Sequence, residues 1–559
     1  MKFFENEKNE NKILVVMSVI TFLINICFIA ESKMIYMSED EFGPIAIAAY
    51  FCGQDWTSVL QNTAYYSYGY SLILTPLFWL TNSAESFYRA AIVLNALFTA
   101  AIVPVSYYIG KRICFYTKKI NLFLVSFAVA NFVVNVGRSQ SAWCETLLTF
   151  LFWCLILNFV KLEEHINFKR VLFGAIALSF TYMVHQRTIG IFISGIICFF
   201  ALCIIKKYKK KYLFCYSATI IILMAVHSGI KQFVQTNIWL NSSTLQGNDY
   251  GGRFQQIASR GILNLLKMAI YTVSGHIYYI AVATLGVGVF AVFLLVKKMI
   301  AKEQMVYVFI GLSVAATFGI SILGITPSSW GEWGSSSYLI YGRYIEIFLG
   351  ILIYMALMFF LENQKDKISL IITMTVVILT AFFTIFGWKN ISELWFNNHC
   401  CIGLNVFYND GNMNFWIPLA LVFICLLVLH CCNNEFEKMV YIGAISVFWI
   451  IAGIIYLEDP LYVEKSKYKL MALIEEKEKR NKNCDFYFYN QNTTYNDTFM
   501  QFLMKDKESL LYQSDYTVIP DEIFYGVTDD SVFFEVNKDM NIIAETGGVY
   551  LFTNDQTAM

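Results

Sequence analysis

The sequence contains little charge. Only 15% of the 559 residues are Asp, Glu, Lys or Arg, whereas a soluble protein carries about 25%. Hydrophobic residues make up 57% of the chain, and they fall into blocks of roughly 18–25 residues, the length that crosses a hydrocarbon core of about 30 Å. The scarcity of charge excludes a soluble globular protein and predicts a polytopic membrane protein.

Metal-ligand spacing and a signal-peptide cleavage site are also missing. The fourteen cysteines include the adjacent pairs Cys400-Cys401 and Cys431-Cys432, but no pair has the spacing of metal ligands, so the sequence predicts neither a zinc site nor a disulfide framework. No small-x-small motif follows the first apolar block, because Glu31-Ser32-Lys33 stands there. We therefore expect this block to be a retained helix.

The apolar blocks predict an all-α polytopic membrane domain over residues 1–456. About thirteen spans can be drawn, near residues 13–30, 87–109, 120–136, 142–160, 171–185, 188–205, 212–230, 268–295, 304–324, 338–360, 368–388, 414–431 and 439–456. With the N-terminus in the cytoplasm, the inner side receives about twice as many Lys and Arg residues as the outer loops, as the positive-inside rule requires. Residues 31–86 then form a long first outer loop.

The tail, residues 457–559, is polar and differs in composition from the rest of the chain. Strand-like runs at 485–490, 531–536 and 548–553 flank or follow a helical run at 494–506. We expect a small α/β domain outside the membrane, on the same side as the first loop. No catalytic constellation stands out in it.

Three consecutive carboxylates, Glu39, Asp40 and Glu41, lie just after the first span. Charge at a membrane surface is costly to desolvate and needs a reason. One interpretation is an ordinary solvated loop. The other is that Asp40, with Glu41 as its companion, acts as a general base that takes a proton from an acceptor hydroxyl.

Three arginines, Arg138, Arg187 and Arg343, lie near the outer ends of spans. Each one alone is explained by a long side chain that reaches for the interface. All three lie on the same leaflet as the carboxylates, and guanidinium groups match phosphate in geometry. A carboxylate base with arginines fits attack on a sugar–phosphate bond, with the arginines stabilising the departing phosphate.

Other polar and aromatic residues permit two interpretations each. Glu145, in the first turns of the fourth span, is either paired inside the membrane or solvated at the interface. His185 is interpreted as structural. The aromatic run at 65–70, with Tyr66 and Tyr68, either forms an interfacial belt or lines a sugar or lipid groove.

The order of these motifs resembles a known family. One span is followed by DEFGPIAIAAYFCGQDW and then by YYSYGYSLILTPLF, which leads into an interfacial helix. This arrangement resembles the GT-C glycosyltransferases that use polyprenyl-phosphate sugars, such as protein O-mannosyltransferases and lipid A aminoarabinose transferases. The resemblance covers roughly residues 10–360 in layout. The chain has Ser67-Tyr68 where the family's aromatic motif usually contains prolines.

The resemblance implies roles for particular residues. Asp40 corresponds to the catalytic base and Glu41 to its companion, while Glu145 matches an acidic residue early in the fourth span. Arg343 and Tyr344 match an Arg-Tyr pair near the outer end of a late span. Relatives invert the anomeric centre in one displacement, so a single base suffices.

The expected function is therefore sugar transfer from a polyprenyl-phosphate donor to a cell-envelope glycan, lipid or protein. We expect no cofactor and no nucleic-acid partner, and we favour the absence of a metal over a metal-binding variant of the oligosaccharyltransferase type. A transporter or flippase of lipid-linked saccharides is an alternative, as is an O-antigen-type polymerase or ligase. A transporter predicts midplane charges and paired broken helices in related halves, and the sequence shows no clear internal repeat.

Overall fold

The computed structural model describes most of the chain. The described residues are 7–27, 39–60, 63–113, 118–240, 262–301, 303–325, 336–362, 366–389, 398–409, 412–458, 469–473, 485–491, 495–505 and 511–557. All structural statements below concern these residues.

Helices dominate the chain up to residue 458. In the first half they are α2 (Glu7–Ile26), α3 (Glu39–Phe51), α4 (Gly69–Leu80), α5 (Ala84–Ile113), α6 (Lys119–Ala130), α7 (Val133–Ser139), α8 (Glu145–Glu164), α9 (Phe168–Val184), α10 (Ile189–Ile205) and α11 (Lys210–Asn237). In the second half they are α13 (Ile262–Ala283), α14 (Val287–Ile300), α15 (Met305–Ile325), α16 (Ser336–Leu339), α17 (Glu346–Leu361), α18 (Lys367–Lys389), α19 (Trp416–Cys431) and α20 (Glu435–Glu458). The short turns are η1 (Thr57–Val59), η2 (Gln186–Thr188), η5 (Asn398–Cys400) and η6 (Ile402–Phe407), and β1 (Tyr408–Asn409) pairs with β2 (Asn412–Met413).

The chain is a multi-pass membrane protein. Among the described residues, eight helices are long and apolar enough to cross a membrane, or up to ten if two bent helix pairs each count as one span. Three shorter apolar helices, α4, α17 and α19, accompany them. The expected count of thirteen spans is not confirmed. The predicted span 268–295 consists of α13 and α14, which meet at 106°, because Leu285 and Gly286 both have positive φ and end the first helix.

The outer faces of the helices are apolar. On α11, for example, Ile221 and Ile222 are 67% and 62% exposed. α18 and α19 also expose large aliphatic and aromatic side chains, such as Phe382 and Ile417. Contiguous apolar surface of this kind is costly in water, and lipid is the solvent that matches it.

The described residues of the predicted first outer loop are largely helical. The sequence predicts a helix from Pro44 to Gly53, and α3 instead begins at Glu39, so that Asp40 and Glu41 lie in its first turn. The predicted interfacial helix is α4, with Pro76 inside it. α4 begins at Gly69 directly against the end of α9, where a Cβ atom would come within 2.5 Å of the Met183 backbone. Only glycine permits this approach.

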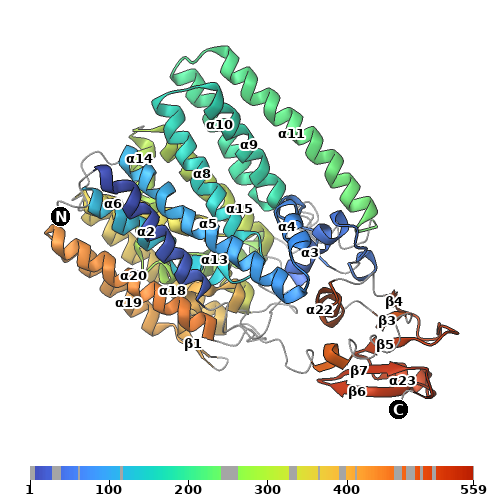
Figure 1. Ribbon diagram of the computed structural model, residues 1–559. Helices are drawn as coiled ribbons and strands as arrows, with labels where there is room; N and C mark the ends of the chain where they lie inside the picture. Colours follow the sequence, from blue (N-terminus) through green and yellow to red (C-terminus); the bar gives the residue numbers. More distant parts are fainter. Residues whose placement is uncertain are drawn as a thin grey trace.

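The C-terminal region forms a five-stranded mixed sheet in the order β4-β3-β5-β7-β6. Its strands are β3 (Phe486–Tyr489), β4 (Leu511–Gln513), β5 (Tyr525–Thr528), β6 (Asn541–Thr546) and β7 (Val549–Thr553). β3 pairs in parallel with β4 and β5, whereas β7 pairs antiparallel with β5 and β6. The sheet stands at one end of the helical body, on the side of α3 and α4 (Figure 1).

One predicted strand of the tail is wrong. The run at 531–536 forms a short helix, α23 (Val532–Val536), rather than a strand. The Asp530 carboxylate accepts a hydrogen bond from the Val532 N–H at 2.9 Å, which satisfies a donor at the start of the helix. The predicted helix at 494–506 corresponds to α22 (Tyr495–Leu503).

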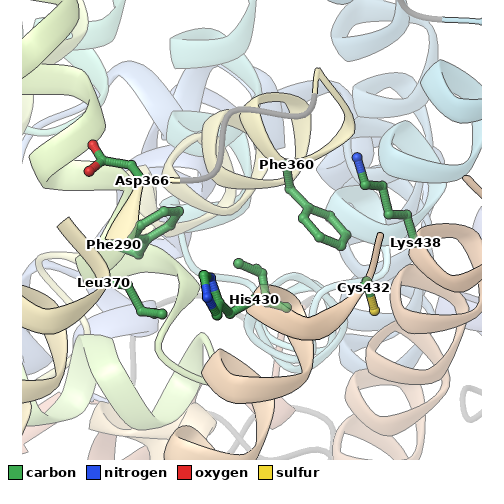
Figure 2. A pocket seen from close by; sticks show the side chains of 8 residues that line it. Phe290, Phe360, Asp366, Leu370, His430, Cys432 and Lys438 are labelled. Carbon is green, nitrogen blue, oxygen red and sulfur yellow. The ribbon is translucent and has the colours of Figure 1, made fainter. Parts of the chain in front are cut away.

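Basic residues that the sequence places on the inner side gather at one end of the helical body. Glu10 of α2 pairs with Lys111 at 2.7 Å and with Lys119 at 3.4 Å, and Lys118 pairs with Glu435 at the start of α20. Close to this end, Asp366, His430 and Lys438 line a small pocket (Figure 2). Its volume of about 20 Å³ is that of a single water molecule, so it is too small for a substrate.

Candidate active site

Six charged side chains from distant parts of the sequence form one cluster, here called the polar cluster. They are Asp40 of α3, Arg138 of α7, Glu145 of α8, Arg187 of η2, Arg343 from the segment before α17, and Glu346 of α17. Except for Asp40, the side chains of these residues are at most 6% exposed. The cluster is therefore a network of buried charges, which is stable only when its members are paired.

Glu145 is shared by two arginines. Its Oε1 accepts hydrogen bonds from Nε of Arg343 at 2.7 Å and from Nη2 of Arg187 at 2.8 Å. Arg343 in turn uses Nη1 to pair with the Asp40 carboxylate. Arg343 thus lies at the centre of the cluster and links the first outer loop to α8.

The second ion pair joins α7 to α17. Nε of Arg138 donates to Glu346 at 2.7 Å, and the hydroxyl of Tyr279 donates to the other Glu346 oxygen. The Trp143 ring lies 4.0 Å from the Arg343 guanidinium and 4.9 Å from that of Arg138. Trp143 therefore connects the two ion-pair systems through cation–π contacts.

Asp40 is the carboxylate of the cluster that solvent reaches. Its side chain is 29% exposed, against 4% for Glu145 and 2% for Glu346. One Asp40 oxygen pairs with Arg343, and the other accepts a hydrogen bond from the Tyr66 hydroxyl at 2.5 Å. Burial and the neighbouring Asp40 charge raise the pKa of Tyr66 well above its ordinary value, so Tyr66 stays protonated and remains a donor.

Glu41, the predicted companion of Asp40, is fully buried. Its Oε1 accepts hydrogen bonds from the Tyr88 hydroxyl at 2.9 Å and from the Ala142 N–H at 2.6 Å. These contacts tie the first turn of α3 to α5 and to the segment before α8. The geometry makes Glu41 an anchor for the helix that carries Asp40.

The segment that carries Arg343 is held by its backbone. The N–H groups of Gly342 and Arg343 both donate to the Cys400 carbonyl, at 2.8 and 3.0 Å. A Cβ atom on Gly342 would lie 2.3 Å from the Tyr279 ring, so glycine allows this segment to pack against α13. Arg343 therefore lies just before α17, and Glu346 is the first residue of that helix.

Three buried nitrogen atoms near the cluster have no hydrogen-bond partner among the described residues. They are Nη2 of Arg138, Nη1 of Arg187 and Nε2 of His185. Nδ1 of His185 accepts a hydrogen bond from the Arg187 N–H at 3.1 Å, which places the proton of the neutral ring on Nε2. Buried donors without acceptors are rare in folded proteins, and an anion is a strong acceptor for such nitrogens.

The tyrosines predicted as substrate contacts separate into two groups. Tyr66 belongs to the cluster, and the ring of Tyr344 lies 4.9 Å from the Arg187 guanidinium. Tyr68 is buried instead against α11, where its hydroxyl lies 3.2 Å from Nδ1 of His227. The structure therefore brings Tyr66 and Tyr344, but not Tyr68, into contact with the cluster.

Sequence reasoning missed Glu346, Tyr279 and the role of Trp143. A charged residue three positions after Arg343, in the first turn of an apolar helix, was the available signal for Glu346. Tyr279 and Trp143 gave no such signal, because aromatic side chains are common at every membrane interface. The described residues include no group of three or more His, Cys, Asp or Glu side chains that could hold a metal ion.

An apolar cavity of about 360 Å³ lies between α13, α14, α15, α17 and α18. Its lining includes Ile280, Phe293, Leu312, Phe318 and Phe348, and no charged side chain. The cavity shares α17 with the polar cluster, because its lining residue Phe348 lies two residues after Glu346. It has the chemistry of a site for a hydrocarbon chain.

No protein-family model matches the chain, and no curated protein sequence matches it. Among solved structures, ArnT from Cupriavidus metallidurans bound to undecaprenyl phosphate superposes with a TM-score of 0.54 at 11% identity, over 99% of each chain. The apo form of the same protein gives a TM-score of 0.53 at 12% identity, over 98% of each chain. At this identity the similarity concerns the fold. The chain has, from end to end, the GT-C fold that its motif order resembles.

Proposed function

We propose that the chain is a membrane glycosyltransferase that moves a sugar from a polyprenyl-phosphate donor to a cell-envelope glycan, lipid or protein at the outer leaflet. One observation carries the proposal. Asp40, the accessible carboxylate of the cluster, pairs with Arg343. Arg343 shares Glu145 with Arg187, and Arg187 and Arg138 each retain a buried N–H donor without a partner among the described residues. Displacement at a sugar–phosphate bond requires a base and an anion-binding site in one cluster.

The reaction uses one displacement. The acceptor hydroxyl gives its proton to Asp40, and its oxygen forms a bond to the anomeric carbon. The bond between that carbon and the phosphate oxygen breaks, and polyprenyl phosphate leaves with the electron pair. Tyr66 and Arg343 hold the two Asp40 oxygens and thereby fix the direction from which the acceptor is deprotonated.

The donor phosphate contacts Arg138 and Arg187, whose buried η nitrogens lack acceptors. Arg343 adds positive charge and positions Asp40. Tyr344, packed on Arg187, lies where it can contact the donor. The apolar cavity between α13, α14, α15, α17 and α18 suits the hydrocarbon part of the donor, and ArnT, which shares the fold, was crystallised with undecaprenyl phosphate.

The proposal is tested by sugar transfer with the purified protein in lipid nanodiscs. A panel of polyprenyl-phosphate hexoses and pentoses is offered, and the release of free polyprenyl phosphate is followed. We expect release from at least one donor, accelerated by an envelope acceptor fraction. Absence of release across the panel, from protein that binds polyprenyl phosphate, would count against glycosyl transfer.

Replacing Arg187 by Gln should weaken binding of polyprenyl phosphate about 10- to 100-fold. A hydrogen bond to a charged group contributes about 1.5–3 kcal/mol, and each 1.4 kcal/mol is tenfold in affinity. Glu145 keeps Arg343 as its partner in this variant. Binding is measured by microscale thermophoresis in nanodiscs. Arg89→Gln, which removes an exposed arginine paired with Glu85, is the matched control and should bind as the wild type does.

The outer location of the cluster can be tested with native cysteines. Cys27 and Cys431 are both exposed, and the positive-inside rule places Cys27 at the outer surface and Cys431 at the inner surface. In intact cells, a membrane-impermeant maleimide should modify Cys27 and leave Cys431 unmodified until the membrane is permeabilised. Peptide mass spectrometry identifies the labelled site. The reverse pattern would place the cluster, and the proposed base, in the cytoplasm.

A further inference from the structure

The C-terminal region contacts the helix that carries Asp40. α22 packs against α3, α5 and η1, and Figure 1 shows it beside α3 at the edge of the C-terminal strands. The Phe502 ring lies edge-on to the rings of Phe87 and Tyr88, with centroid distances of 6.1 and 6.2 Å. The tail is therefore joined to the membrane domain through aromatic packing next to the polar cluster.

Lys505 makes a second contact with the first outer loop. Its Nζ donates to the carbonyls of Phe78 at 3.1 Å and Thr81 at 2.5 Å and lies 4.4 Å from the centre of the Phe78 ring. The last carbonyls of a helix lack intrahelical partners and carry partial negative charge. Lys505, which is only 3% exposed, thus caps the C-terminal end of α4 from a remote part of the chain.

Both contacts lead to Asp40. Phe502 supports the ring of Tyr88, whose hydroxyl donates to Glu41, the residue next to Asp40 in the first turn of α3. Lys505 holds the end of α4, and the segment just before α4 carries Tyr66, which donates to Asp40. One contact therefore fixes the helix that bears the carboxylate, and the other fixes the segment that orients it.

We propose that Phe502 and Lys505 are positioning residues that hold Asp40 in its reactive orientation, so that the C-terminal region is required for turnover. The kinetic part of this inference rests on the proposed function, whereas the structural part does not. Phe502 contacts α5 and Lys505 contacts the end of α4, and their effect passes through α3 and α4. Displacement of a reacting group by about 1 Å can cost about 100-fold in rate.

Hydrogen exchange tests the structural part. Lys505→Met removes the ammonium group and keeps an unbranched apolar side chain that can pack on Phe78. We expect faster exchange in peptides from α3 and α4 and unchanged exchange in α15 and α18. Lys538→Met, which removes an exposed lysine of the same C-terminal region, should leave α3 and α4 unchanged. Equal exchange in the Lys505→Met variant and the wild type would overturn the inference.

Steady-state kinetics test the functional part. Lys505→Met should lower kcat about 10- to 100-fold and leave KM for the donor unchanged, because the arginines of the cluster keep their contacts. Tyr88→Phe keeps the ring against Phe502 but removes the hydrogen bond to Glu41. It should likewise lower kcat and leave KM for the donor unchanged. This variant also serves if Lys505→Met does not fold. A rise in KM with unchanged kcat would contradict positioning.

The two proposals can fail separately. If the wild type transfers no sugar, glycosyl transfer is wrong, and the exchange comparison still decides whether Lys505 holds α3 and α4. If exchange in α3 and α4 rises while kcat stays at the wild-type value, the positioning role is wrong and glycosyl transfer stands. If exchange rises and kcat falls together, both are supported.

Discussion

Replacing Asp40 by Asn is expected to lower turnover by about 10²- to 10⁴-fold, the usual contribution of a positioned general base. Asn has nearly the same shape as Asp, and its Oδ1 can still accept from Arg343 while its NH2 group donates to the Tyr66 oxygen. It cannot take a proton from the acceptor. Binding of polyprenyl phosphate should persist, because the arginines with unpartnered nitrogens do not bond to Asp40. Release of polyprenyl phosphate from a sugar donor measures the effect.

Asp55→Asn is the matched control. Asp55 is an exposed carboxylate in the same outer loop, and its Oδ1 accepts a hydrogen bond from the Thr57 N–H, so its substitution by Asn should preserve both turnover and binding. Full activity of the Asp40→Asn protein would remove Asp40 from the mechanism. Another group would then have to deprotonate the acceptor, and the cluster would keep only its role in binding the donor phosphate.

The positions of the charged residues along the chain predicted much of the cluster. The sequence predicts that three charged residues lie at span ends on the same side of the membrane, namely Asp40, Arg187 and Arg343. Charge at the end of a span lies near the interface, so the sequence predicts that these residues lie in one layer. Glu346 was not predicted, because its partner Arg138 is 208 residues away in the sequence and only the packing of α17 near α7 brings the two together.

The position of Glu41 could not be predicted from the sequence. Asp40 and Glu41 are adjacent and both acidic, so the sequence pattern does not distinguish their roles. In a helix, neighbouring side chains diverge by about 100°, so the Asp40 carboxylate contacts Arg343 while the Glu41 carboxylate contacts Tyr88 of α5. The distinction depends on where α3 begins, and helix boundaries are the least certain feature of any pattern-based prediction.

Helix breaks and short strands were the least predictable parts of the fold. The 268–295 block contains no Asp, Glu, Lys or Arg, so hydropathy could not reveal the bend between α13 and α14. The SVFFEV run has the composition of a strand, but the Asp530 cap and the burial of Phe533 in the aromatic core of the sheet stabilise a helical turn. In both places tertiary packing overrides local composition.

Replacing Glu145 by Gln should strongly destabilise the folded protein. Glu145 neutralises Arg187 and Arg343 together, at 2.8 and 2.7 Å, with all three side chains at most 6% exposed. Removing one member of a buried ion network leaves uncompensated charge and costs about 3–5 kcal/mol. By contrast Glu85→Gln, at an exposed pair with Arg89, should cost less than about 1 kcal/mol. Intrinsic tryptophan fluorescence during heating in nanodiscs measures the difference between the two variants.

A double variant separates loss of charge balance from loss of packing. If Glu145→Gln destabilises because it strands positive charge, then adding Arg187→Met should recover part of the loss, and the two effects will not add. If the loss comes from altered packing of α8, the second substitution should make the protein less stable still. Recovery of stability without recovery of turnover is the expected result, since Arg187 also supplies an unpartnered nitrogen for the donor phosphate. A Glu145→Gln protein that unfolds at the wild-type temperature would show that the cluster is hydrated. Water would then satisfy the unpartnered nitrogens, and they would no longer indicate an anion-binding site.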